Sequence, residues 1–309
     1  MKHLIVTHRD ADGITSAISY AMCFLERNNK DISLSSILNV FDILDINYGE
    51  DIFKALDKKH YNLDNYESFV LLDFSLDIEI MRYLRNKFKE KFIWIDHHKL
   101  ACENIEKDIK DITGVRNQDK AACLLVYDFF EKEIPEFAKY INDMDLWNWE
   151  LENSKELFSG LKNLKDFFSE DLFEYVFELL HDSIFKLKKQ DLIFRGQIIL
   201  DYENDFIKYN CRLGGITEWQ GYSTFVINAT INPGKISDYV FNRPEFNSID
   251  VVFVWYKTYL SNLYKISLRS RKTGNVDVSL LASKFPEGGG HKNAAGFVVD
   301  DLYKTGIDF

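Results

Sequence analysis

Three short segments in the first hundred residues hold the side chains best suited to chemistry. The first, THRDADG (7–13), supplies His8, Asp10 and Asp12 at two-residue steps, so an extended or looped segment can turn all three toward one side. Carboxylate oxygens and imidazole nitrogens together suit a hard divalent cation better than a soft metal, which prefers thiolates. A solvated Asp-x-Asp-Gly turn is the alternative for this run taken alone.

The run IDHHK (95–99) is more specific. Asp96 precedes two adjacent histidines, His97 and His98, at the end of an apolar segment, where such a trio has little structural use. Adjacent side chains of an extended chain point to opposite sides, so one histidine can bind metal while the other faces a substrate. Two histidines therefore predict two roles.

The third run, SFVLLDF (68–74), places Asp73 at the end of an apolar strand. An unpaired charge is costly to bury there, so the carboxylate needs a partner. A metal ion is the favoured partner, and a capping role at the start of the next helix is the alternative.

A later run, NDMDLW (142–147), offers two acids. We take Asp143 as the metal ligand from its position after an apolar segment, and Asp145 as a cap of the next segment. Trp147 and Trp149 lie close by; core packing is the favoured interpretation, with stacking on a nucleobase as the alternative.

These polar runs fall where strands are expected to end. Apolar segments alternate with helical patterns, which predicts a parallel sheet, and ligands of such sheets bind beyond the carboxyl ends of the strands. The expected strands are 2–7, 68–74 and 91–98, and the expected helices are 14–27, 76–88, 119–132 and 134–142.

The rest of the chain shows two residue patterns, one helical and one rich in β-forming residues. Leu, Phe, Lys and Glu recur at helical spacing over 154–206, and short β-rich runs follow at 223–231, 250–256 and 264–270, with a helix expected at 276–285. The predicted fold class is α/β: an N-terminal parallel-sheet domain (1–150), a helical connector (151–207) and a smaller C-terminal α/β domain with a mixed sheet (208–309).

Near the C-terminus, EGGGHKNAAGF (287–297) contains a glycine triplet, Gly288, Gly289 and Gly290, followed by His291. Glycines lack a Cβ, so backbone N–H groups of a turn can approach an anion and form a nest. Upstream, Arg269 and Arg271 alternate on one face of an expected strand, and a guanidinium donates two parallel hydrogen bonds to a phosphate. A flexible loop and a solvated strand charge are the respective alternatives.

Charge and composition restrict the partners. The formal net charge is −11, with 26 Lys and Arg against 40 Asp and Glu in residues 1–207, and 12 against 9 from Lys208 onward. An acidic chain is a poor binder of long duplex DNA, which requires many phosphate contacts. The chain shows neither a signal segment nor an apolar run of bilayer length, so we expect no membrane partner and a cytoplasmic location.

Five motifs in order, HRDADG, LLDFS, IDHHK, NDMDLW and GGGHKNAAG, resemble the DHH phosphoesterase superfamily with its C-terminal DHH-associated (GGGH) domain. Among its members the chain looks most similar to the B-type oligoribonucleases, or nanoRNases. HRDADG departs from the His-x-x-Pro-Asp-x-Asp form of some members and matches the His-x-Asp-x-Asp-Gly subgroup.

The resemblance implies a set of site residues. His8, Asp10 and Asp73 would hold one divalent metal ion and Asp12, Asp73, His97 and Asp143 a second; both would be Mn²⁺, with Mg²⁺ or another hard divalent ion as the alternative. His98 would contact the scissile phosphate or assist the leaving group, and Asp96 would orient a histidine. Arg269 and the loop from Gly288 through Gly289 and Gly290 to His291 would bind substrate.

The function implied is hydrolysis of short single-stranded oligonucleotides (nanoRNA) or of 3',5'-bisphosphonucleosides (pAp) by a water activated between two metal ions. The alternatives are a phosphodiesterase of cyclic or linear dinucleotides, a single-strand DNA exonuclease and a catalytically silent nucleotide-binding regulator. The sequence is compatible with a homodimer and does not fix the oligomeric state.

Overall fold

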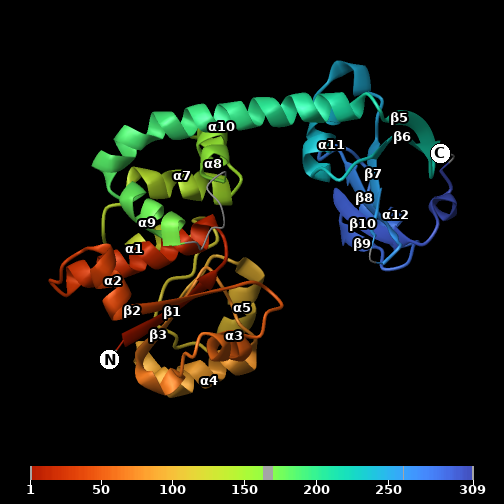
Figure 1. The fold of residues 1–309 in the computed structure, drawn as a ribbon. Coiled ribbons are helices and arrows are strands. Elements are labelled where there is room, and N and C mark those ends of the chain that lie inside the picture. The colour runs from red at the N-terminus through yellow and green to blue at the C-terminus, as the bar shows by residue number, and fades with distance from the viewer. Residues whose placement is uncertain (1, 163–169, 260, 308–309) are drawn as a thin grey trace. The chain divides into compact units, whose positions relative to one another are not determined.

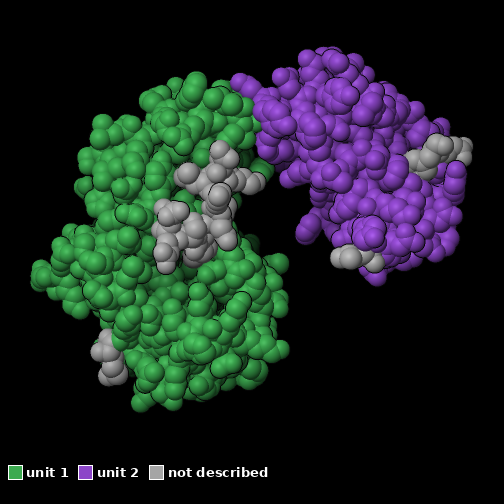
Figure 2. Space-filling view, in the orientation of Figure 1, with its two compact units in different colours: residues 1–199 green, residues 200–309 purple. Residues whose placement is uncertain are grey.

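The computed structural model describes residues 2–162, 170–259 and 261–307. It divides into two compact units, residues 1–199 and 200–309 (Figure 2). The 30-residue helix α10 (Asp182–Cys211) contains the boundary between them. Part of the predicted connector, residues 163–169, lies outside the described residues. None of the helices in the described ranges is both long enough and apolar enough to cross a membrane.

The first unit is built on a parallel sheet (Figure 1). Its strands are mostly apolar and contribute to a core on each face, as in a parallel sheet covered by helices. In sheet order they are β2 (Phe41–Ile46), β1 (Lys2–His8), β3 (Tyr66–Leu72) and β4 (Phe92–Ile95).

Alternate residues of these strands feed two hydrophobic cores. Ile5 and Val70 belong to the core on one face, whereas Leu4 and Leu71 belong to the core on the other. The first core is completed by α1 (Ala11–Arg27), α2 (Leu34–Val40), α6 (Ala122–Phe130), α7 (Glu136–Asp145), α8 (Ser154–Lys162) and α9 (Glu170–Leu179). The second is completed by α3 (Ile52–Lys58), α4 (Ile78–Phe88) and α5 (Lys99–Asp108).

The second unit contains a mixed six-stranded sheet in its described residues. Only the β6–β7 pair is parallel, and the other neighbours are antiparallel. In sheet order the strands are β5 (Gly215–Trp219), β6 (Tyr222–Asn228), β7 (Val251–Lys257), β8 (Tyr264–Ser270), β10 (Ala294–Val299) and β9 (Gly289–His291). Helices α11 (Pro233–Phe241) and α12 (Val278–Ala282) pack on opposite faces, in separate cores.

The predicted fold class is confirmed, with a parallel sheet in the N-terminal part and a mixed sheet in the C-terminal part. Four strands, β2, β5, β9 and β10, have no counterpart in the sequence prediction. The helix expected over 276–285 is shorter, Val278–Ala282, and the glycine run after it forms strand β9 in place of the expected turn.

Candidate metal centre

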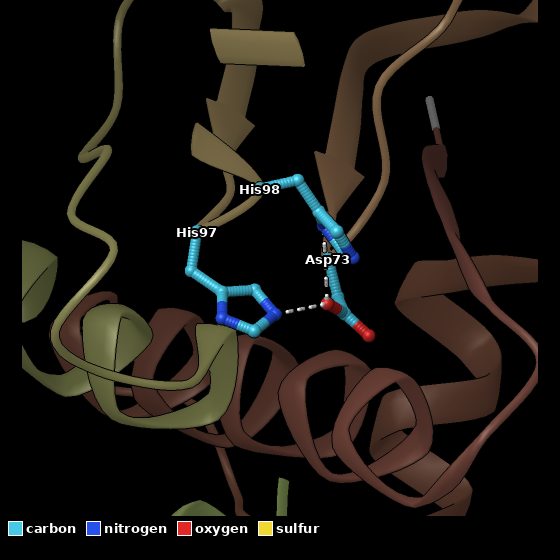
Figure 3. A group of neighbouring side chains, drawn as sticks. All are labelled: Asp73, His97 and His98. Carbon is cyan, nitrogen blue, oxygen red and sulfur yellow. Dashed lines mark ion pairs between the residues drawn. The ribbon is translucent and has the colours of Figure 1, made fainter. Parts of the chain in front are cut away.

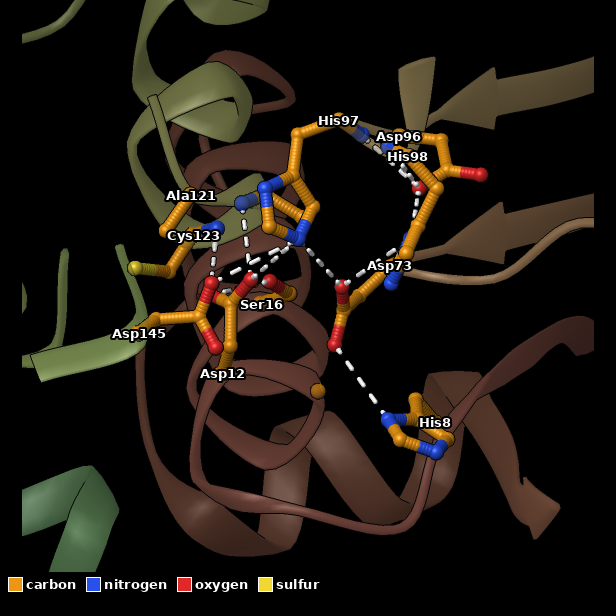
Figure 4. A network of polar contacts seen from close by, with 12 residues as sticks. His8, Asp12, Ser16, Asp73, Asp96, His97, His98, Ala121, Cys123 and Asp145 are labelled. Atoms are coloured by element: carbon orange, nitrogen blue, oxygen red, sulfur yellow. Dashed lines mark hydrogen bonds and ion pairs between the residues drawn. The ribbon is translucent and has the colours of Figure 1, made fainter. Parts of the chain in front are cut away.

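Side chains from the ends of β1, β3 and β4 and from two helices converge at the carboxyl edge of the parallel sheet (Figure 4). This is the edge at which open parallel sheets bind their ligands. Among the described residues, three groups of side chains have donor atoms that lie within 4.8 Å of one another. They are Asp73 with His97 and His98, His8 with Asp10 and Asp73, and Asp12 with His97 and Asp145.

The turn from β1 into α1 shapes the first group. The carboxylate of Asp10 caps α1 by accepting a hydrogen bond from the backbone N–H of Gly13 at 2.8 Å, and its other oxygen lies 2.7 Å from Nδ1 of His8. Gly13 permits this turn because a Cβ there would lie 2.0 Å from the carbonyl oxygen of His8. Helix α1 therefore begins at Ala11, three residues before the predicted start.

Asp12 is fully buried in the first turn of α1 and has partners far along the chain. Its two carboxylate oxygens accept hydrogen bonds from the backbone N–H groups of Ala122 at 2.7 Å and Cys123 at 2.8 Å. Helix α6 has no capping side chain of its own, so Asp12 satisfies N–H groups at its N-terminus. The same carboxylate lies 4.0 Å from Nε2 of His97.

Asp73 lies at the centre of the cluster (Figure 3). Its Oδ1 atom is 3.2 Å from Nε2 of His97 and 4.0 Å from Nδ1 of His98, and its Oδ2 atom is 3.9 Å from Nδ1 of His8. The residue is 1% exposed and has a positive φ of 51°, a backbone conformation that is uncommon for a residue other than glycine. Such local strain is typical of functional sites.

Asp96 organises the two histidines that follow it. One carboxylate oxygen accepts hydrogen bonds from the backbone N–H of His97 at 2.7 Å and lies 2.7 Å from Nδ1 of His98, while the other accepts from the hydroxyl of Ser75. Burial alone would raise the pKa of Asp96, but the hydrogen bonds from His98 and Ser75 hold it below its ordinary value. The bond to Asp96 in turn raises the pKa of His98.

The structure brings Asp145, and not Asp143, into the cluster. Oδ2 of Asp145 lies 3.5 Å from Nε2 of His97, whereas the carboxylate of Asp143 accepts hydrogen bonds from the backbone N–H groups of Glu150 at 2.9 Å and Leu151 at 3.2 Å. The reason is that α7 continues to Asp145, beyond the predicted end at residue 142. Two residues of an α-helix are separated by about 200° around its axis, so only one of the two acids can face the cluster.

Excess negative charge is the main electrostatic feature of the cluster. Burial raises the pKa of Asp73 well above its ordinary value, and the carboxylates of Asp12 and Asp10 raise it further. Burial also raises the pKa of Asp145, to about 8, with the same two acids adding to the effect. Burial lowers the pKa of His97, against the opposing effect of the Asp12 carboxylate. The buried acids of the cluster therefore outnumber the cationic side chains that the described residues place beside them.

The donor set fits divalent metal ions. Oδ2 of Asp73 and Oδ2 of Asp145 are buried and have no hydrogen-bond partner in the described part of the chain. Buried carboxylates without such a partner are stabilised by a metal ion, and oxygen and imidazole ligands are those that Mn²⁺ and similar hard ions accept. The grouping of donor atoms places Asp73 in two of the three sets.

Tyr48 is a neighbour of the cluster that the sequence analysis missed. Its ring centroid lies 4.5 Å from that of Phe74, 5.3 Å from that of His8 and 5.9 Å from that of His98. Burial raises the pKa of Tyr48, and the carboxylates of Asp96 and Asp73 raise it further, so the hydroxyl is neutral at physiological pH. Tyr48 follows β2, and recognition of that strand would have placed it at this edge of the sheet.

In the second unit, the two arginines of β8 have different partners. The guanidinium of Arg271 donates hydrogen bonds to the carbonyl oxygens of Ile249 at 3.1 Å, Phe241 at 2.7 Å and Phe246 at 2.8 Å. Arg269 donates only to the carbonyl of its neighbour Leu268, at 2.8 Å, and has no acidic partner among the described residues. Arg271 is thus committed to the fold, and Arg269 is available to a ligand.

The glycine run contributes to the same sheet. Ala294 of β10 pairs with Arg269 on one side and with His291 on the other, so the three side chains form a row on one face. Alanine leaves space between the two longer side chains. Gly288 and Gly290 are required sterically, since a Cβ would lie 1.8 Å from the carbonyl oxygen of Ala282 and 2.6 Å from that of Ala294, respectively.

Comparison with known proteins finds a match for the first part of the chain. A model of the DHH family, N-terminal domain, matches residues 2–147. Uncharacterized protein R106 of Acanthamoeba polyphaga mimivirus is 26% identical over 251 residues, which cover 76% of this chain and 54% of that protein. The chain thus spans about half the length of this curated relative.

Two solved structures share the fold over nearly the whole chain. The DHH domain of a member of the s1p family of ribosomal proteins has a TM-score of 0.58 at 15% identity, covering 96% of this chain and 82% of that chain. The pGpG-specific phosphodiesterase PggH from Vibrio cholerae has a TM-score of 0.54 at 13% identity, covering 96% and 93%. At these sequence identities, both comparisons show a similarity of fold alone.

Proposed function

We propose that the protein is a metal-dependent phosphoesterase that hydrolyses short single-stranded oligonucleotides and 3',5'-bisphosphonucleosides. The observation that carries this proposal is that Asp73 lies close to imidazoles and carboxylates from three other segments. In this cluster the acidic side chains outnumber the cationic ones, and burial together with the neighbouring carboxylates raises the pKa of Asp73. The match of residues 2–147 to the DHH family supports the same class of reaction.

The ligand assignment is built from the groups of donor atoms, and the second set includes Asp73 because that residue lies beside His97. His8, Asp10 and Asp73 would hold one divalent ion, and Asp12, Asp73, His97 and Asp145 would hold the second. Asp145 takes the place that the sequence analysis gave to Asp143. Bound Mn²⁺ ions would lower the pKa of a water molecule and neutralise charge on the phosphoryl oxygens.

His98 is suited to contact the phosphate or the leaving oxygen. Its Nδ1 atom is held by Asp96 at 2.7 Å, which fixes the orientation of the ring and favours the protonated form. In that form Nε2–H of His98 is a hydrogen-bond donor without an acceptor among the described residues. Asp96, with Ser75 on its other oxygen, would act only through His98 and the backbone of His97.

Residues 1–150 would be the catalytic domain, 151–207 a connector and 208–309 the substrate-binding domain. Within the last, Arg269 and His291 would bind a phosphate that is not cleaved, over the small side chain of Ala294. The glycine triplet Gly288 to Gly290 would let the backbone approach the same group. Arg269 is favoured for this role because the guanidinium of Arg271 already donates its hydrogen bonds to backbone carbonyls of the fold.

A short substrate is favoured because the chain has a net charge of −11, which opposes the many phosphate contacts that a long nucleic acid makes. The phosphodiesterase of dinucleotides is the second candidate, and the fold shared with PggH, named as pGpG-specific, favours it over the remaining alternatives. A single-strand DNA exonuclease and a silent nucleotide-binding regulator follow in that order.

The test is a substrate panel with Mn²⁺: RNA of two to five nucleotides, matched DNA, pAp, pGpG and a cyclic dinucleotide, with products separated by chromatography. The proposal expects mononucleotides from the short RNA or phosphate from pAp, lost on addition of a chelator and in Asp145→Asn. Exclusive cleavage of pGpG or the cyclic dinucleotide would select the second candidate. Absence of turnover with every substrate, in protein shown to bind Mn²⁺, would refute the enzymatic proposal.

A further inference from the structure

Trp147 is a large aromatic residue left in solvent beside the proposed metal centre. Its side chain is 67% exposed, and it follows Asp145, a proposed ligand, by two residues. Two residues span at most about 7 Å of chain, so the indole is attached within side-chain reach of the cluster. The core packing expected from sequence therefore does not account for Trp147.

The backbone that presents Trp147 is strained. Trp147 and Trp149 both have positive φ angles, 59° and 58°, in the left-handed region that bulky residues other than glycine rarely adopt. Such conformations persist only where the surroundings enforce them, and they cluster at ligand-binding sites.

Asp143 enforces this turn. Its carbonyl oxygen accepts hydrogen bonds from the N–H groups of Asn148 at 2.9 Å and Trp149 at 3.4 Å, and its carboxylate accepts from Glu150 and Leu151. The acid that is turned away from the cluster thus fixes the segment that follows the cluster. This gives Asp143, which is 4% exposed, a positioning role.

Trp149 supplies the support for the exposed indole. It packs against the first core, its ring lies 6.4 Å from that of Phe158, and the ammonium of Lys155 lies 5.7 Å from its centroid. The ring of Trp147 meets that of Trp149 edge to face, with centroids 5.0 Å apart. One tryptophan is therefore anchored and orients the other, whose free face remains open to solvent.

We propose that Trp147 is a stacking platform for the nucleobase next to the phosphate that is hydrolysed. This inference rests on the proposed function, and it adds a base-binding site to it. Every nucleobase has a flat π-face, so a single indole binds bases without selecting sequence, as a hydrolase of short mixed oligonucleotides requires. Stacking of one base on an aromatic side chain corresponds to about 5- to 140-fold in affinity.

The kinetic test compares a dinucleotide with an analogue that lacks the base beside the scissile phosphate. We expect Trp147→Ala to raise KM for the dinucleotide by about 5- to 140-fold. The increase should be much smaller for the abasic analogue, and Trp147→Phe should restore most of the loss. Tyr259→Ala is the matched control, because Tyr259 is an aromatic residue 97% exposed in the second unit. Equal losses for the two substrates, or no loss for the dinucleotide, would overturn the platform.

A binding measurement separates this inference from the proposed reaction. AMP should quench the tryptophan fluorescence of the Mn²⁺-loaded protein saturably, and Trp147→Phe should remove most of the quenching, whether or not any substrate is turned over. Ribose 5-phosphate, which has no base, should not quench. Quenching by AMP that is the same in Trp147→Phe and the unmodified protein would place the base elsewhere and contradict the platform.

Discussion

Nε2 of His97 lies 3.2 Å from Oδ1 of Asp73, although the two residues follow different strands of the parallel sheet. The other oxygen of Asp73 faces His8 at 3.9 Å and has no hydrogen-bond partner in the described residues. Asp73 thus connects the cluster formed at the start of α1 with the cluster formed after β4. A substitution here tests both at once.

Asp73→Asn should abolish Mn²⁺ binding while making the metal-free protein more stable at pH 8. The raised pKa of Asp73 means that its ionised form is disfavoured in the fold, and asparagine removes that charge. In calorimetric melts the unmodified protein should gain about 2.7 kcal/mol for each ion present at one hundred times its Kd, and the variant should gain nothing. Asp77→Asn, an exposed acid four residues away, is the control. Full stabilisation of Asp73→Asn by Mn²⁺ would contradict a bridging role.

Asp145→Asn and Asp143→Asn form a matched pair of isosteric changes two residues apart. Loss of a residue that hydrogen-bonds to a metal ligand commonly weakens metal binding by about 10–100-fold. Loss of a direct ligand in Asp145→Asn should therefore weaken Mn²⁺ binding by at least about 10-fold. Asp143→Asn should retain the metal and lose stability of about 1–3 kcal/mol, because its carboxylate accepts two backbone hydrogen bonds. Titration calorimetry and urea unfolding measure the two effects. The opposite pattern would return Asp143 to the ligand set.

Much of the fold could be predicted because three strands of the first sheet, β1, β3 and β4, are largely apolar runs with polar residues at their ends. Strand β2 was missed because Asp42 and Asp45 interrupt its apolar character; the structure satisfies them with Lys2 and Arg9. Strand β5 was missed because most of its residues are exposed, as befits the edge of a sheet. Partners distant in sequence decide the case of β2.

The site was predictable where topology alone places a residue at a strand end, as for His8, Asp73 and His97. It was not predictable where the outcome depends on the last turn of a helix, because one additional turn of α7 exchanges Asp143 for Asp145 at the cluster. The capping of α6 by Asp12 was also invisible, since its partners lie 110 and 111 residues away. Local sequence carries no record of such contacts.

Arg269→Ala and Arg271→Ala should separate substrate binding from stability. Arg271→Ala leaves three backbone carbonyls without their donor and should lower the stability of the second unit by about 1.5–3 kcal/mol. Arg269→Ala should leave stability nearly unchanged and raise KM for substrates with a second phosphate. Arg269→Lys tests the forked geometry, because an ammonium retains the charge without the paired donors.

The control for the arginine pair is a substrate with a single phosphate, whose KM Arg269→Ala should change little. Thermal melts and steady-state kinetics on the same preparations give both readouts. Loss of Mn²⁺ binding in Arg269→Ala, or an unchanged KM for pAp, would contradict the assignment of this arginine to a phosphate that is not cleaved.

The stability of the metal-free protein should fall as the pH rises from about 6.5 to 8. Asp145 has a pKa of about 8 in the fold, against about 3.9 when unfolded, so over this range the folded state keeps a proton that the unfolded state has released. His98 acts in the same direction, because its raised pKa gives stability that is complete below about pH 6.5 and lost above it. Urea unfolding in a chelator at the two pH values measures the fall, and Asp145→Asn should reduce it. Mn²⁺ should reverse the trend, since it binds the deprotonated acids. A metal-free protein that is as stable at pH 8 as at pH 6.5 would mean that the carboxylates ionise without cost in the fold, and the case for metal ions as their missing partners would be lost.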